Sequence, residues 1–188
     1  MVRPLVILIL CLGLLETGNA ELLLVPKLVE VELDGVKLKE LEFSDDGKAV
    51  TYQAPRGWGY SGSSTQLTLR PPGKSHAEAT ISRVRLEEAG GFDEGSLARL
   101  VDEAVVQLPK GSENAKLVSQ EKNPLLIQGK ETFLIILTYT FYGEKFTRSI
   151  LILNRGVDQI RSQLTCAEAD FQELHAIFMR SQYTWQHL

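Results

Sequence analysis

The sequence predicts an α+β fold in which an antiparallel β-sheet is flanked by helices within a single domain. Many apolar residues alternate with polar ones, as Val29, Val31 and Leu33 do, and this period is typical of a half-buried strand. The apolar residues between Leu97 and Leu108 instead recur every three or four positions, which indicates one face of a helix. Short turn sequences such as Asn154-Arg155-Gly156 separate the later strands, and such short connections favour neighbouring antiparallel strands.

The first twenty residues have the three-part layout of a secretory signal peptide. Arg3 gives a positive start, residues 5–15 are apolar, and Gly18-Asn19-Ala20 provides the small residues that precede a cut. A membrane-spanning helix needs about 20 apolar residues, and this run stops at Glu16. We therefore predict cleavage after Ala20 and a secreted or periplasmic protein. The alternative is a signal that is retained as an uncleaved anchor.

The composition of residues 21–188 narrows the classes of partner. The formal net charge is −4, and removal of Arg3 and Glu16 with the signal leaves it unchanged. Mild acidity does not favour a nucleic-acid partner, and the absence of a polybasic run does not favour a membrane surface after cleavage. Cys11 leaves with the signal, so Cys166 stands alone and cannot form an internal disulfide. No N-x-S/T acceptor occurs after residue 20, and together these features favour a bacterial envelope.

The first half of the chain predicts strands followed by a helix. Residues 28–33 and 36–43 form a hairpin around Asp34-Gly35, a strong turn signal. The apolar face of a later strand changes side near Ser82 or Arg83, which indicates a β-bulge. The helix over residues 97–108 is expected to be capped by Ser96 and ended by Pro109. The other strands of this half are predicted at residues 49–54, 65–70 and 77–86.

The second half predicts a meander of strands and a closing helix. Residues 132–142 are apolar on both faces at first, so this strand is expected to be central and covered on both sides. Thr165-Cys166-Ala167-Glu168 has the spacing of a capping box, and Phe171 to Phe178 provides the apolar face of the closing helix. The other strands of this half are predicted at residues 115–121, 125–128, 146–153 and 157–164.

Two glycine-containing stretches resemble nucleotide-binding motifs without their structural context. Gly57, Gly59 and Gly62 fit G-x-G-x-x-G, but a dinucleotide fingerprint requires a helix after the third glycine, and the sequence here continues as a strand. We therefore expect the glycines to bend the chain between two extended segments. Pro72-Gly73-Lys74-Ser75 ends like a phosphate loop, but Pro71 and Pro72 lack the amide hydrogens that hold a phosphate.

No recognisable catalytic or metal-binding constellation occurs, so we predict no enzyme, no cofactor and no metal. Gly59-Tyr60-Ser61-Gly62-Ser63 ends in serine where a nucleophile elbow has glycine. His76, His175 and His187 form no recognisable pair. Cys166 at the start of a helix is compatible with a lowered pKa and a reactive thiol. The alternative, a half-buried residue at a junction between a strand and a helix, is favoured.

Arg56, Trp58 and Tyr60 are the candidate partner-binding residues. Exposed aromatic residues and arginines dominate the binding energy of interfaces, and these three lie together on a glycine-rich loop. The alternative for Trp58 is that it folds back over the edge of the core, as large aromatic side chains commonly do.

The chain resembles the PsbP-like family, which includes the photosystem II extrinsic subunit, a Ran-binding nuclear import factor and many bacterial envelope proteins. Tyr52-Gln53-Ala54-Pro55-Arg56-Gly57-Trp58 resembles the strand and Pro-x-Gly-Trp turn of that family, and residues 164–181 resemble its closing helix. The resemblance covers about residues 36–188, which would leave residues 21–35 as an N-terminal extension or hairpin strand. It implies an α/β/α sandwich and an accessory or docking role without catalysis. No plastid-type transit segment is present, and nothing points to a photosystem or to Ran, so neither partner is transferred.

We therefore predict a secreted or periplasmic module that binds a protein partner. Two alternatives stay open. One is a carrier with a small-ligand pocket between the sheet and the helices near Trp58, and the other is an enzyme whose unrecognised site uses Cys166 or a carboxylate.

Overall fold

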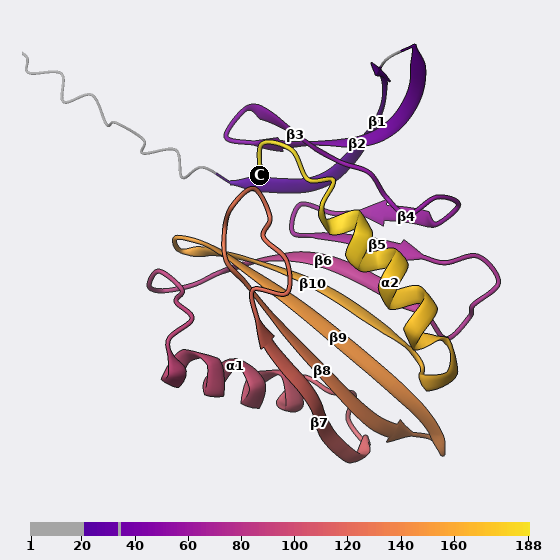
Figure 1. The fold of residues 1–188 in the computed structure, drawn as a ribbon, viewed down its shortest axis with the longest axis vertical. Helices are drawn as coiled ribbons and strands as arrows, with labels where there is room; N and C mark the ends of the chain where they lie inside the picture. Colours follow the sequence, from indigo (N-terminus) through magenta and orange to yellow (C-terminus); the bar gives the residue numbers. More distant parts are fainter. Residues whose placement is uncertain (1–20, 34) are drawn as a thin grey trace, which may run out of the picture.

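The computed structural model describes residues 21–33 and 35–188, and the predicted signal segment 1–20 lies outside the described residues. Within the described residues, ten strands form two antiparallel sheets (Figure 1). The smaller sheet has the order β1-β2-β3, and the larger one has the order β4-β5-β6-β10-β9-β8-β7. The strands are β1 (Leu22–Leu33), β2 (Val36–Asp45), β3 (Lys48–Tyr52), β4 (Gly59–Gly62), β5 (Gln66–Arg70), β6 (Glu78–Arg85), β7 (Glu113–Lys122), β8 (Thr132–Phe141), β9 (Glu144–Arg155) and β10 (Asp158–Ala167).

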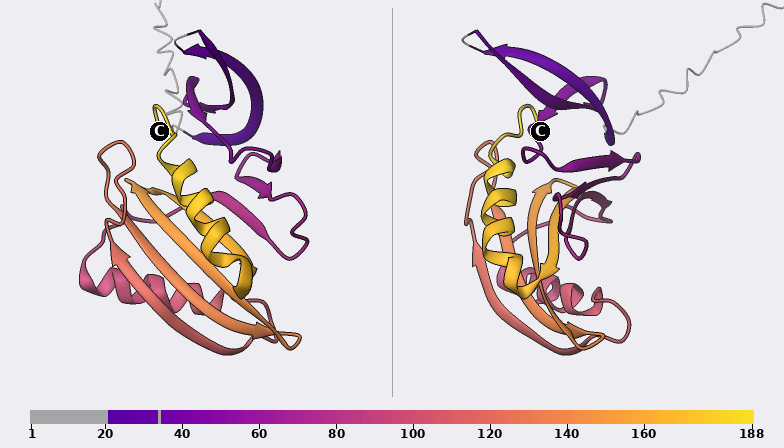
Figure 2. Two further views of the ribbon diagram at one scale, coloured as in Figure 1. Left: turned by 45° about the vertical axis from the view of Figure 1, so that its right-hand side comes forward. Right: turned by 90° about the vertical axis from the view of Figure 1, so that its right-hand side faces the viewer.

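The two helices lie on opposite faces of the larger sheet (Figure 2). Helix α1 (Glu94–Val106) packs Leu100 and Ala104 against β8 and β9, whereas α2 (Phe171–Gln182) packs Leu174 and Phe178 on the other face. The smaller sheet shares the second of these cores. The predicted α+β class and the α/β/α sandwich are therefore confirmed. In the described part of the chain, no helix is both long and apolar enough to span a bilayer.

The central position predicted for residues 132–142 is confirmed by β8. Phe133 and Ile135 lie in the core beneath α1, and Leu134 between them lies in the core beneath α2. β8 pairs with β7 on one side and with β9 on the other. A strand that is buried on both faces needs apolar residues at consecutive positions, and this explains the continuous apolar run.

The predicted hairpin around Gly35 is present, but its strands belong to the separate smaller sheet. Leu33 and Val36 are register partners in β1 and β2. β1 extends back to Leu22, and both Leu22 and Leu24 are fully buried in the core, although they lie in the predicted N-terminal extension 21–35. A turn signal fixes which strands are neighbours but not which sheet they join, so the sequence could not separate the two sheets.

The C-terminal residues close the smaller sheet. Gln186 and Thr51 exchange two backbone hydrogen bonds, of 3.1 and 2.9 Å. Trp185 is buried, and its ring lies 4.6 Å from that of Tyr52 and 5.7 Å from that of Phe43. The end of the sequence is therefore part of the core.

Three local predictions in the two halves of the chain are wrong. The N-cap of α1 is Asp93 and not Ser96, because the Asp93 carboxylate accepts hydrogen bonds from the Ser96 amide at 3.1 Å and from the Ser96 hydroxyl at 2.7 Å. β6 pairs with β10 without a bulge. The apolar face is interrupted there because Arg83 is held by Glu21 and Asp158. Residues 125–128 form a loop and not a strand, and this loop places Leu125 and Ile127 in the core.

The predicted capping box at residues 165–168 is also wrong. β10 continues to Ala167, a single 3₁₀ turn covers Glu168–Asp170, and α2 begins at Phe171 without a side-chain cap. The Thr165 hydroxyl instead accepts a hydrogen bond from Arg148 Nε at 3.0 Å. Strand pairing therefore overrides the local capping pattern.

Candidate functional site

The glycine-rich segment between β3 and β5 is a turn followed by a short edge strand. The Trp58 amide donates to the Pro55 carbonyl at 3.1 Å, and Gly57 adopts a φ of +80°, which favours glycine. Strand β4 then pairs with β5, so the predicted bend between extended segments is confirmed. Glycine is required at position 62 because a Cβ there would lie 2.3 Å from the Leu24 carbonyl oxygen. Backbone conformation at Gly57 and close packing at Gly62 therefore explain two of the three glycines.

The phosphate-loop-like stretch is likewise explained by intramolecular contacts. Lys74 Nζ lies 2.6 Å from Asp170 Oδ1, immediately before α2. This hydrogen bond raises the pKa of Lys74. The ammonium group therefore ties the β5–β6 loop to the start of α2.

The three candidate residues Arg56, Trp58 and Tyr60 line one groove with a volume of about 780 Å³. The groove, called here the Trp58 groove, lies between the β1–β2 hairpin and α2. Its apolar lining residues are Leu28, Leu38, Leu41, Ala54, Pro55, Trp58, Tyr60 and Ile177, and its cationic ones are Lys37, Lys39, Arg56 and Arg180. The structure thus brings the predicted residues together with side chains of β1, β2 and α2.

Trp58 forms the wall of this groove rather than a projecting contact. Its side chain is 7% exposed and stacks on Phe178 of α2, with ring centroids 6.3 Å apart and an interplanar angle of 7°. This matches the interpretation in which Trp58 covers the edge of the core. Tyr60 is 41% exposed and Arg56 is exposed, so these two are the accessible members of the predicted set. Their role in binding a partner stays a prediction.

The cations of the groove differ in how their charge is balanced. Lys37 and Lys39 lie opposite Glu32 and Glu30 in the β1–β2 register. Among the described residues, Arg56 and Arg180 make no ion pair. Arg180 Nε only donates to the Ala176 carbonyl of its own helix, at 3.2 Å. The groove therefore presents two arginines whose charge is available to a ligand.

A buried polar network fixes α2 behind the groove. The Tyr52 hydroxyl lies 2.6 Å from Ser181 Oγ, and the Gln182 side chain accepts hydrogen bonds from Ser162 Oγ at 2.8 Å and from Trp185 Nε1 at 3.3 Å. Burial raises the pKa of Tyr52, so its hydroxyl stays protonated. Because the partners come from β3, β10, α2 and the C-terminal residues, the network holds both sheets to one helix.

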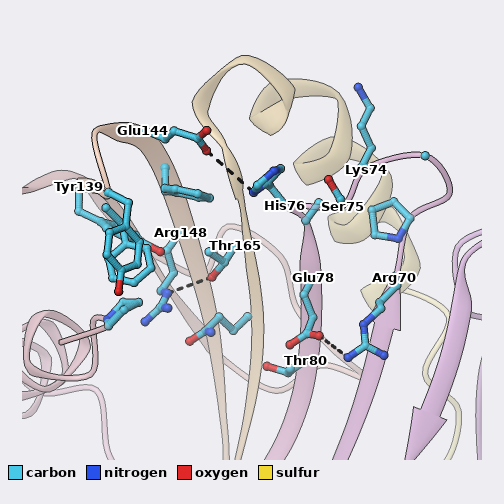
Figure 3. Close-up of a pocket in the computed structure, with 18 residues that line it drawn as sticks. Arg70, Lys74, Ser75, His76, Glu78, Thr80, Tyr139, Glu144, Arg148 and Thr165 are labelled. Atoms are coloured by element: carbon cyan, nitrogen blue, oxygen red, sulfur yellow. Dashed lines mark hydrogen bonds and ion pairs between the residues drawn. The ribbon is translucent and has the colours of Figure 1, made fainter. Parts of the chain in front are cut away.

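A second cleft lies on the α1 face of the larger sheet, beyond the C-terminal end of α1 (Figure 3). Its volume is about 980 Å³, and its lining includes Tyr139, Phe146, Arg148 and Thr165. We call it the Arg148 cleft. The sequence reasoning missed it, although a signal was present. Arg148 lies on the same face of β9 as Ile150 and Ile152, which belong to the core beneath α1. A charged residue at such a position is unexpected.

The thiol considered in the sequence analysis lies within the core of the protein. Cys166 is fully buried, and burial, followed by the nearby Asp170, raises its pKa to about 12. This agrees with the favoured interpretation of Cys166 as a buried residue near the junction of a strand and a helix, and not with the alternative of a lowered pKa, because the thiol lies on the buried face of β10. Burial lowers the pKa of His175, which stacks on Phe171 at 4.7 Å. Within residues 21–33 and 35–188, no group of three His, Cys, Asp or Glu side chains is placed to hold a metal ion.

Similarity to known proteins is found at the level of structure. No model of a known protein family matches the sequence, and no curated protein matches it. The solution structure of cyanobacterial PsbP from Synechocystis sp. PCC 6803 is similar with a TM-score of 0.54 at 13% identity, covering 91% of this chain and 95% of that one. The crystal structure of LpqN from Mycobacterium tuberculosis, described as involved in cell envelope biogenesis, is similar with a TM-score of 0.51 at 12% identity, covering 86% of this chain and 90% of that one. The chain therefore has the PsbP-like fold that the sequence resemblance predicts.

Proposed function

We propose that this protein is a non-enzymatic accessory module, secreted or periplasmic in a bacterium, that docks a protein partner in the Trp58 groove. The main observation behind the proposal is that an apolar wall lies in the same groove as Arg56 and Arg180. The charges of these two arginines have no counter-ion among the described residues. The accessory role implied by the PsbP-like resemblance supports it. The shared fold with LpqN, a protein involved in cell envelope biogenesis, supports the location.

The chemistry of the groove selects a partner segment that is acidic and apolar. Leu28 is 49% exposed and Tyr60 is 41% exposed, and large apolar side chains that share an exposed surface are typical of interaction sites. Arginine is the residue best suited to pair with a carboxylate through two parallel hydrogen bonds. The net charge of the whole protein is −4, so these arginines form a local positive site on an acidic molecule. A segment with one or two carboxylates beside a large apolar residue fits this surface.

Site-specific photo-crosslinking in the producing host tests the proposal. A photoreactive phenylalanine derivative replaces Tyr60 in one variant and Val118 in a control variant. Val118 is 59% exposed on β7, at the opposite edge of the larger sheet. We expect position 60 to form a discrete adduct with one envelope protein and position 118 to form none.

Charge reversal then separates docking from chance proximity. Arg56→Glu and Arg180→Glu are expected to abolish the adduct and to weaken binding of the purified partner by about tenfold or more, as loss of charge-assisted hydrogen bonds does. Equal adducts at both positions, or an adduct that survives both charge reversals, would refute the proposal.

A small-ligand carrier is the second candidate, and the volume of the groove favours it. About 780 Å³ lies within the usual range of ligand pockets, roughly 300–1,000 Å³. Polar groups of Gln53, Ser181 and Thr184 also line the groove. Denaturing extraction of protein purified from its host, followed by mass spectrometry, distinguishes the two functions. A stoichiometric small molecule that is lost in Tyr60→Ala would favour the carrier.

A further inference from the structure

The Arg148 cleft exists because α1 covers only part of its face of the sheet. Ile150 and Ile152 of β9 lie beneath the helix, which ends at Val106. Arg148 and Phe146 continue the same row of β9 beyond the end of the helix, where they line the cleft. The floor of the cleft is therefore formed by β6, β8, β9 and β10, and the β5–β6 loop lines one part of it.

Arg148 is buried in this cleft with only neutral partners. It is 7% exposed, Nε donates to Thr165 Oγ1 at 3.0 Å, and Nη1 donates to the Gln107 carbonyl at 3.0 Å. Its guanidinium lies 5.7 Å from the centre of the Tyr139 ring, between Tyr139 and Thr165 in Figure 3. A guanidinium has five N–H donors, and these contacts use two of them.

The other cations on the rim of the cleft already have carboxylate partners. Arg70 lies 2.6 Å from Glu78, and Lys74 lies 2.6 Å from Asp170. Among the described residues, Arg148 has no such partner. The C-terminal end of α1 offers it only a partial negative charge of about half a unit. A buried charge without a counter-ion is costly, so a ligand carboxylate would complete the site.

The surroundings of Arg148 define the rest of the ligand. Tyr139, Phe141 and Phe146 form an aromatic cluster beside it, with ring centroids 5.7 Å apart for Tyr139 and Phe146 and 6.5 Å apart for Phe141 and Phe146. All three line the cleft. These rings provide an apolar surface next to the unpaired guanidinium, so charge recognition and apolar contact are adjacent.

We propose that the Arg148 cleft binds a carboxylate that is attached to an aromatic or apolar group. The carboxylate pairs with the free N–H groups of Arg148, and the apolar group packs on the rings of Tyr139, Phe141 and Phe146. Two sources share this chemistry: the C-terminal residue of a peptide and a small aromatic acid. The site is separate from the Trp58 groove and does not depend on the function proposed for it.

Nuclear magnetic resonance of residues 21–188 tests this site directly. The probes are the tripeptide Ala-Ala-Phe with a free carboxylate, the same tripeptide with an amidated C-terminus, and phenylacetate. We expect at least one of the two acids, at millimolar concentration, to shift the Nε–H resonance of Arg148 and the amide of Thr165. The amidated peptide should shift neither.

Variants separate charge recognition from packing. Arg148→Met keeps the length of the side chain and removes its charge, so we expect the acids to bind about ten- to hundredfold more weakly. Arg148→Lys should bind with intermediate affinity, because it keeps the charge but loses the planar fork. Arg99→Met, which removes an exposed arginine of α1, is the matched control and should bind like the wild type.

A thermal melt of each variant first confirms that it folds. The relative affinities of the two acids then show whether the natural ligand is a peptide C-terminus or a small acid. Tighter binding of the tripeptide acid indicates a peptide C-terminus, and tighter binding of phenylacetate indicates a small acid. The proposal would be overturned by any of three results. These are equal shifts with the tripeptide acid and its amide, unchanged affinity in folded Arg148→Met, and no shift with either acid.

Discussion

Replacement of Phe178 by alanine tests whether α2 is docked through the stack that also forms the wall of the Trp58 groove. Phe178 is 1% exposed, and its ring is nearly parallel to that of Trp58, at 7° and 6.3 Å. Truncation of a buried phenylalanine costs about 3–5 kcal/mol through lost burial and the remaining cavity. A domain of this size loses about 2–4 °C of melting temperature per kcal/mol, so we expect a decrease of roughly 6–20 °C.

Urea denaturation of residues 21–188, followed by circular dichroism, measures this loss. Tyr142→Ala is the control, because Tyr142 is an aromatic residue that is 91% exposed, and its removal should change the free energy of unfolding by less than about 0.5 kcal/mol. Iodide should quench Trp58 more strongly in Phe178→Ala than in wild type, since the ring loses its stacking partner. A loss below about 1 kcal/mol with an unchanged denaturant slope would refute the packing described for α2.

Three further predictions concern backbone contact, thiol reactivity and pH. Gly62→Ala should destabilise the fold by about 1–3 kcal/mol in urea denaturation, because its Cβ would lie 2.3 Å from the Leu24 carbonyl oxygen. An unchanged midpoint of unfolding would contradict the close approach of β1 and β4. Cys166 should resist a thiol-specific reagent at about pH 8 until the protein unfolds, because burial raises its pKa to about 12; rapid modification of the folded protein would show that the thiol is accessible. Burial lowers the pKa of His175, and its Nε2 is buried without a hydrogen-bond partner among the described residues. As the pH falls below about 6.5, His175 therefore takes up a proton in the unfolded chain before it does so in the folded protein. The contribution of His175 to stability is lost over this range of pH. His175→Phe should flatten the dependence of the unfolding free energy on pH between about 5 and 8, and an identical slope in both proteins would exclude this role.

Periodicity predicted the parts of the fold that depend on burial. The apolar run of β8 implied a strand covered on both faces, and Phe133 and Leu134 do lie in different cores. The three- and four-residue spacing identified both helices, with Leu100 and Phe178 on their buried faces. These predictions succeeded because burial acts on the side-chain pattern of each element separately.

Predictions that depended on competition between local and distant contacts failed. Thr165 has the sequence of a capping residue, yet it pairs with Arg148 and Glu78 in the sheet. Arg83 interrupts an apolar face without a bulge because Glu21 and Asp158 neutralise it. The partners of these residues are far away in the sequence, so a local pattern could not reveal them.

The sequence identified three neighbouring residues as candidates for binding a partner, and that role stays a prediction. Arg56, Trp58 and Tyr60 do line one groove, because a short glycine-rich turn keeps neighbouring residues together. The contribution of Arg180 from α2 depended on the tertiary fold. Arg148 carried only one sequence signal, a charge at a buried position of an apolar strand, and its aromatic neighbours come from two strands paired in register.

The pairing of Gln186 with Thr51 has a consequence for the moment at which this protein matures during synthesis. A chain emerges from the ribosome with its N-terminal end first, so β3 is synthesised long before Gln186, its partner at Thr51. Trp185, which lies against Tyr52 and Phe43, arrives at the same time as Gln186. Nascent chains that do not yet contain these residues should therefore leave β3 and its aromatic neighbours uncovered and accessible to chaperones or to an export machinery.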